Sequence, residues 1–273
     1  MQKLIVFAFA ISLISQSSCR KVYDFIRDHP DAHDSLCRIT RIYARGYFGH
    51  PDTFNIAYNA KGSPLSMLAT GPYGTSGNLD QYFRYDRYNR LTDYLWTFIK
   101  SNGALVWHKY GYPRPNFVTD TVISYTGEIH GPSPIAASSY YYYIVGYTLD
   151  AHDRIERVWG LPNDPHEPPQ PGGLITYDAN GNLPPSDSGV VYDNMVNPYR
   201  TNKVWQFVYN DYSRNNQVLT GLFAPTPIYN SFGLPVSLPN LNIRNYIIFF
   251  LSNTDPAMQF EYACSPPKGP INY

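Results

Sequence analysis

Side chains suited to metal or acid–base chemistry are few and scattered along this chain of 273 residues. The closest cluster reads HPDAHD, where His29 and His33 stand four residues apart, with Asp31 and Asp34 beside them. On a helix this spacing would place both imidazoles on one face, as a metal site requires. Pro30 separates the histidines and no third ligand follows, so a solvated segment explains the cluster better, and we expect no metal.

The chain carries no motif of a familiar catalytic centre. It lacks the Gly-x-Ser-x-Gly elbow, a phosphate-binding loop and the His-Glu-x-x-His zinc motif, and we expect no cofactor. Paired carboxylates on neighbouring strands would make a glycosidase site, so an envelope hydrolase acting on glycans stays open as the alternative hypothesis. Glutamates for such a site are scarce, being only Glu128, Glu156, Glu167 and Glu261. Enzyme activity is therefore the less favoured hypothesis.

Aromatic side chains are the remaining functional signal, since Phe, Trp and Tyr make up 16% of the chain. Tyr94, Trp96 and Phe98 alternate and would share one face of a strand, and Tyr141 and Tyr143 would share one face of another. An exposed row of this kind could stack on a glycan or accept a peptide or partner protein. If a helix and loops cover the rows, the same residues belong to the core. A binding or structural module is the favoured hypothesis.

The composition indicates a β-rich protein without a nucleic-acid partner. The chain has 21 basic and 21 acidic residues, and so lacks the basic excess that binds phosphate backbones. Charged residues make up only 15%, whereas Tyr, Pro and Gly number 26, 24 and 19. Tyrosine favours strands, and Pro and Gly favour turns. We therefore expect short strands joined by many turns.

A seven-residue pattern recurs five times and predicts how these strands are joined. The copies are YNAKGSP at 58–64, YDRYNRL at 85–91, LDAHDRI at 149–155, YDANGNL at 177–183 and YNSFGLP at 229–235. Asn or Asp at the second position accepts hydrogen bonds from the following backbone, as in a type I turn. Gly, Asn or Asp at the fifth tolerates a left-handed backbone. Each copy predicts a β-hairpin with a G1 bulge, whose acids make turns and not chemistry.

One segment departs from the strand pattern. In TNKVWQFVYNDYSRNN, apolar residues recur at helical intervals, namely Val204, Trp205, Val208, Tyr209 and Tyr212. With Thr201 as N-cap, this spacing predicts a helix over 202–213. The expected fold is mostly β, an antiparallel meander of hairpins that forms a curved sheet or partly open barrel, with this one helix covering a face.

The first residues resemble an export signal that ends in a lipidated cysteine. A short apolar run follows Lys3, and small residues lead to Cys19, the order found in secretory signals. Small residues directly before cysteine resemble the lipobox of bacterial lipoproteins, although Gln16 stands where that motif usually has leucine. The resemblance implies lipid on Cys19 and a membrane anchor in the bacterial cell envelope, at the outer membrane. Cleavage near Ser17 or Ser18 would instead leave a soluble secreted or periplasmic protein.

The expected domain organisation is a signal peptide over 1–18, a tether over 19–36 and a single antiparallel β-domain over 37–273. Two cysteines remain in this domain, Cys37 and Cys264. In an oxidising compartment an even pair suggests a disulfide between the first and last strands. Closing so long a loop would stabilise the fold by about 4–5 kcal/mol. Two buried free thiols are the alternative.

The whole pattern resembles a family of short lipoproteins of Bacteroidetes-type bacteria. The shared features are the lipidated start, the Cys-x-Ile strand CRITRI at 37–42, the YNAKG-like hairpins and the closing strand EYAC at 261–264. The hairpins also resemble, in degenerate form, the YD repeat of Rhs-type surface proteins, with arginine after the bulge only at Arg90 and Arg154. These resemblances imply hairpins and an anchor, and no activity comes with them.

Overall fold

The computed structural model describes residues 37–45, 51–71, 80–97, 105–111, 121–129, 139–150, 152–161, 172–185, 189–220, 226–238 and 258–265. The expected signal peptide, the tether, Cys19 and the histidines at 29 and 33 lie outside these ranges. The statements made about them from sequence stay predictions.

Twelve strands form one sheet in the order β12-β13-β14-β1-β2-β3-β4-β5-β6-β7-β8-β9, and β10 pairs with β11 in a second sheet. The strands are β1 (Cys37–Arg45), β2 (Pro51–Tyr58), β3 (Pro64–Ala69), β4 (Gln81–Tyr85), β5 (Leu91–Thr97), β6 (Leu105–Gly111), β7 (Thr121–Ile129), β8 (Ser139–Leu149), β9 (Ile155–Leu161), β10 (Val190–Tyr192), β11 (Gln217–Leu219), β12 (Ile228–Tyr229), β13 (Pro235–Leu238) and β14 (Met258–Cys264).

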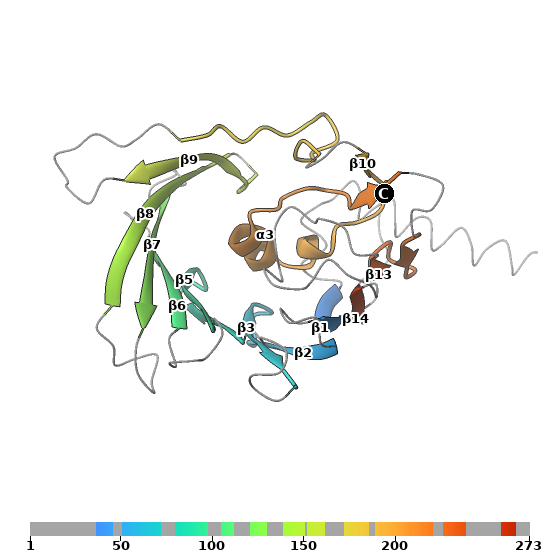
Figure 1. The fold of residues 1–273 in the computed structure, drawn as a ribbon, viewed down its shortest axis with the longest axis horizontal. Coiled ribbons are helices and arrows are strands. Elements are labelled where there is room, and N and C mark those ends of the chain that lie inside the picture. Colours follow the sequence, from blue (N-terminus) through green and yellow to red (C-terminus); the bar gives the residue numbers. More distant parts are fainter. Residues whose placement is uncertain are drawn as a thin grey trace, which may run out of the picture.

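The main sheet is an antiparallel meander, as expected. From β1 to β9 each strand pairs with the next strand along the chain, and β14 returns to pair with β1. β9 and β12 are its two edges, so the sheet is not a closed barrel. In Figure 1 it curves around the helix α3, which lies on the concave side. The predictions of a mostly β fold and of one helix in the region 202–213 are confirmed within the described residues.

The helix is shorter than predicted. α3 spans Lys203–Tyr209, because Asn210 adopts a left-handed backbone with φ of 51° and closes the helix. The prediction of helix through residue 213 is therefore wrong. No helix in the described ranges is long and apolar enough to span a membrane.

The predicted N-cap is wrong by one residue. Thr201 ends the preceding 3-10 helix η2 (Pro198–Thr201), and its hydroxyl donates to the Pro198 carbonyl. The cap is Asn202, whose Oδ1 accepts from the Val204 N–H at 2.9 Å. The Nδ2 of the same side chain donates to the Gly62 carbonyl at 2.9 Å. One asparagine therefore starts the helix and also fastens it to the first hairpin turn.

The helix contributes aromatic side chains to the main core. Trp205 is 1% exposed and meets Phe83 of β4 edge-on, with ring centroids 5.3 Å apart. It also stacks on Tyr209, whose hydroxyl donates to Gln81 Oε1. Phe83 in turn stacks on Tyr94 of β5. The apolar stripe on α3 is therefore core and not a ligand surface.

All five recurring heptads form the predicted turn. In each copy the Oδ1 of the second residue accepts two backbone N–H groups, two and four residues further on. The fifth residue of each copy has a positive φ, at Gly62, Asn89, Asp153, Gly181 and Gly233. The prediction of a type I turn with a bulge is confirmed.

The cross-strand pairs beside these turns follow the same pattern. The first residue of a copy pairs with its seventh at Tyr58–Pro64, Tyr85–Leu91, Leu149–Ile155 and Tyr229–Pro235, each next to a register shift. The copy at 177–183 lies outside the assigned strands, although the Asp178 N–H still donates to the Asn182 carbonyl at 2.8 Å. Four of the five copies are therefore hairpins of the sheet, whereas the fifth is a turn outside the assigned strands, so the hairpin predicted there is not formed.

Tyrosine hydroxyl groups connect three of the five copies, and the strand β14, to carbonyl groups earlier in the chain. The hydroxyls of Tyr58, Tyr85, Tyr177 and Tyr262 donate to the carbonyls of Ile39, Pro64, Ile155 and Pro235 at 2.7, 2.5, 3.0 and 2.8 Å. Pro64, Ile155 and Pro235 are each the seventh residue of a copy. The recurrent tyrosine therefore fills the core with its ring and satisfies a backbone acceptor with its hydroxyl.

The disulfide joins the two ends of the described chain. Cys37 and Cys264 are bonded, with their Cα atoms 4.0 Å apart and 227 residues between them in sequence. They are opposite residues of β1 and β14. The cross-link therefore covalently closes the contact between the first and last strands, and Cys37 is buried.

Removing one tyrosine hydroxyl should test these links. Tyr85→Phe leaves the Pro64 carbonyl without its tyrosine donor, so the free energy of unfolding should fall by about 1 kcal/mol in urea titration. Tyr88→Phe is the matched control, because Tyr88 is exposed on the same hairpin and its hydroxyl contacts only Arg87 among described partners. Equal losses in the two variants would contradict a structural role for the Tyr85 hydroxyl.

The bulge position predicts a contrast between two glycines. A Cβ would meet nothing within 4 Å at Gly62 or at Gly173, but only Gly62 has a positive φ, of 87°. Gly62→Ala should therefore destabilise the protein by about 1 kcal/mol through backbone strain alone. Gly173→Ala should leave the urea midpoint unchanged or raise it slightly. A neutral Gly62→Ala variant would refute the turn geometry.

Candidate functional site

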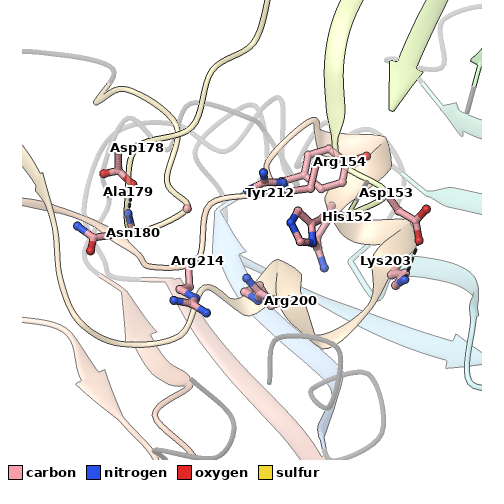
Figure 2. Close-up of a pocket in the computed structure, with 12 residues that line it drawn as sticks. His152, Asp153, Arg154, Asp178, Ala179, Asn180, Arg200, Lys203, Tyr212 and Arg214 are labelled. Atoms are coloured by element: carbon pink, nitrogen blue, oxygen red, sulfur yellow. Dashed lines mark hydrogen bonds and ion pairs between the residues drawn. The ribbon is translucent and has the colours of Figure 1, made fainter. Parts of the chain in front are cut away.

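A cleft opens between two of the recurring turns. It has a volume of about 330 Å³ and is bounded by residues 152–154, residues 178–181, Arg200 of η2, Lys203 and Gln206 of α3, and Tyr212 and Arg214 of the following segment. We call it the basic cleft. In the view of Figure 2, Arg200 and Arg214 lie between the residues of the turn at 178–181 and those of the turn at 152–154.

The turns that frame the basic cleft are held by their own acids. Asp150 Oδ1 accepts from the N–H groups of His152 and Arg154 at 2.8 and 3.0 Å. Asp178 Oδ1 accepts from those of Asn180 and Asn182 at 2.9 and 2.8 Å. These bonds fix the tip residues of each turn at the rim, because the side chain sets the local backbone.

Arg154 forms one wall of the basic cleft in a fixed orientation. Its Nε and NH2 atoms each lie 2.8 Å from Asp150 Oδ2, and its guanidinium lies 4.0 Å from the ring centre of Tyr177. Burial favours the protonated Asp150 carboxyl, but hydrogen bonds from the Arg154 and His152 N–H groups and the Arg154 side chain outweigh it. The pKa of Asp150 is therefore held below its ordinary value.

Positive charge exceeds negative charge around the basic cleft. Four basic side chains line it, Arg154, Arg200, Lys203 and Arg214, against two carboxylates, Asp153 and Asp178. Counting Asp150 behind Arg154, one positive charge is still in excess. Lys203 Nζ pairs with Asp153 Oδ2 at 3.0 Å, but the two side chains are 54% and 63% exposed, so water and salt weaken the pair. The arrangement attracts an acidic group.

Each of the two carboxylates of the basic cleft has a described contact of its own. Asp153 faces Lys203, and Asp178 caps its own turn through Oδ1. Within the described residues no group of three His, Cys, Asp or Glu side chains could hold a metal ion. No contact of these carboxylates favours the alternative of a glycan hydrolase with paired carboxylates, which stays a prediction from sequence.

The aromatic rows considered from sequence do not form one described surface. Tyr94 is 8% exposed and packs on Phe83, so of the two alternatives considered for its row this residue follows the one in which it belongs to the core. Trp96 is partly buried against the same core. The side chains of Phe98, Tyr141 and Tyr143 lie outside the described ones.

The basic cleft was missed by sequence reasoning because its residues come from separate segments. Arg154 carried a signal, since it follows the bulge of a heptad copy, as Arg90 does. Arg200 and Arg214 carried none. They reach the cleft because η2 and the segment after α3 fold back beside the turns.

Comparisons with known proteins add no family to this geometry, since no protein-family model matches the chain and no curated protein sequence matches it. The function has to be inferred from the basic cleft itself.

The lowered pKa of Asp150 predicts how acid affects stability. A carboxylate whose pKa is lower in the folded state stabilises above its unfolded pKa of about 4, and the contribution is lost as pH falls through the folded value. Asp150→Asn should keep the turn, as Asn59 does in the first copy, but should be less stable by about 1 kcal/mol at pH 7. Its urea midpoint should also change less between about pH 6 and pH 3.

The matched control is Asp153→Asn on the same turn. It removes only the exposed pair with Lys203 and places an asparagine at a left-handed position that asparagine tolerates. Its stability at pH 7 should stay within about 0.5 kcal/mol of the parent. If the urea midpoint of Asp150→Asn depended on pH as that of the parent does, the contacts of Arg154 with the Asp150 carboxylate would not have the stabilising role assigned to them.

Proposed function

We propose that this chain is an envelope lipoprotein whose domain of YD-like hairpins binds an acidic ligand in the basic cleft. Lipid on Cys19 would hold it at the outer membrane, and the ligand would be a glycan or an envelope peptide that carries carboxylate, sulfate or phosphate groups. The domain would run from 37 to 273 as one unit. The role is binding and not catalysis.

The observation that carries this proposal is the surplus of basic side chains around a cavity. Arg214 lines the basic cleft and has no side-chain partner among the described residues. A guanidinium aimed at a carboxylate, sulfate or phosphate makes two parallel hydrogen bonds, so it confers geometry as well as attraction. A cleft of about 330 Å³ is of the size that takes a small ligand group.

The cellular address is supported by the N-terminal sequence and by the disulfide. The run before Cys19 has the order of a lipoprotein signal. Disulfides persist in oxidising compartments, so the Cys37–Cys264 bond agrees with a protein that is exported. A lipid anchor would present the basic cleft to polymers and proteins of the envelope.

Binding of acidic probes to the full chain in detergent should test the proposal. The probes are a panel of acidic oligosaccharides, with uronate, sialylated and sulfated members, their neutral counterparts, and a short glutamate peptide. By isothermal titration calorimetry at least one acidic probe should bind and its neutral counterpart should not. The affinity should fall as salt is raised, because the cleft is open to solvent. Arg200→Gln with Arg214→Gln should weaken binding by about tenfold or more.

Arg87→Gln is the control for this test. Arg87 is a basic residue on another turn, where it lies over the Tyr88 ring and lines neither described cavity near Arg214. Its loss should leave the affinity unchanged. Failure of every acidic probe to bind, or equal binding by the double variant, would sink the proposed function.

A further inference from the structure

A second cavity continues from the basic cleft on the other side of the turn at 178–182. It has a volume of about 470 Å³ and reaches the β10 strand, including Val191 and Tyr192. Asp178, Asn180 and Arg214 line both cavities. The two cavities therefore meet at this turn, and we treat them together as one groove. We call it the groove.

Asp178 at the middle of the groove differs from the other aspartates that hold turns. In the copies at 85–91 and 149–155 the Oδ2 atoms of Asp86 and Asp150 accept from arginine four residues on, at 2.7 and 2.8 Å. At the copy in the groove that position is Asn182, whose side chain instead exchanges hydrogen bonds with Asn215. Asp178 Oδ2 consequently has no partner among the described residues.

The other described carboxylates along the groove, Asp153 and Asp193, each have a side-chain partner. Asp193 accepts the Met195 N–H through Oδ1 and the Tyr229 hydroxyl through Oδ2. Asp153 pairs with Lys203. Within the described part of the chain, Asp178 is thus the carboxylate that lines both cavities and whose Oδ2 accepts no hydrogen bond.

Two side chains that can donate hydrogen bonds lie at the turn that carries Asp178. Neither has a side-chain partner among the described residues. The Asn180 amide and the Arg214 guanidinium make no side-chain contact with a described residue. A charged acceptor with amide and guanidinium donors nearby matches neighbouring hydroxyl groups of a sugar ring, where one hydroxyl donates and the next accepts. Val191, 43% exposed, adds an apolar surface at the far end for the carbon face of a ring.

From these contacts we propose that the groove binds an acidic oligosaccharide. The acidic substituent lies in the basic cleft, and a neighbouring sugar ring lies across the turn at 178–182 with a hydroxyl donating to Asp178 Oδ2. The ring continues toward Val191. This inference rests on the proposed function and specifies its ligand class. An acidic peptide would use the basic side chains equally well, but its carboxylates would be repelled by Asp178, which a hydroxyl is not.

The test replaces the carboxylate while keeping the turn. Asn59 and Asn230 make the same two backbone contacts in their copies, so Asp178→Asn removes charge and leaves the fold intact, as circular dichroism and the urea midpoint would verify. The full chain in detergent is titrated with the best-bound acidic oligosaccharide, with the single acidic sugar from it, and with the glutamate peptide. Asp178→Asn should weaken the oligosaccharide by about tenfold. Its effect on the single acidic sugar should be less than about twofold.

Asp86→Asn is the matched control, because it changes an equivalent turn aspartate that lines neither part of the groove. It should leave oligosaccharide affinity as in the parent. Oligosaccharide binding that ignores Asp178→Asn overturns the inference and leaves the proposed function standing. If the glutamate peptide binds and no glycan does, the inference is likewise overturned and the proposed function stands. If neither the peptide nor any glycan binds, the inference and the proposed function are both wrong.

Discussion

The rest of the structure depends on one local interaction, in which an Asn or Asp side chain accepts two N–H groups of its own turn. It occurs five times with the same geometry. Because it fixes a left-handed residue three positions later, it determines where each strand ends and how the next one is paired. In three of the copies the tyrosine that precedes it then reaches the carbonyl of an earlier strand. Local turn chemistry thereby sets the long-range order of the sheet.

The same turns also position the helix and the groove. Asn202 at the start of α3 donates to the carbonyl of the first turn, and Lys203 reaches the third. The helix is thus attached to the turns by polar contacts while Trp205 fills the core beneath. The copy at 177–183 lies outside the assigned strands, and its own aspartate and the contacts of Asn182 with Asn215 hold it at the centre of the groove. Rigid support of this kind is what a binding site needs.

How much was predictable depends on the distance over which each interaction acts. The turns could be predicted because Asp86 or Asn230 meets only its own neighbours. The helix start could not, since Thr201 and Asn202 are both good caps by type, and the structure uses Thr201 to end η2 and Asn202 to cap α3. Whether the row at Tyr94 is exposed or covered could not be decided, because Phe83 and Trp205 come from other elements. The basic cleft required the fold, as Arg200 and Arg214 are apart from the turns in sequence.

The pairing of β1 with β14 bears on when this protein acquires its structure. β1 lies between β2 and β14, so the earliest described strand lacks one neighbour until residue 264 has been synthesised. Contacts between such distant residues slow folding. The covalent staple between Cys37 and Cys264 cannot form before both have met an oxidant. If the chain is exported, it would therefore complete its fold only after it has crossed the inner membrane. Until then it would stay unfolded enough to be translocated.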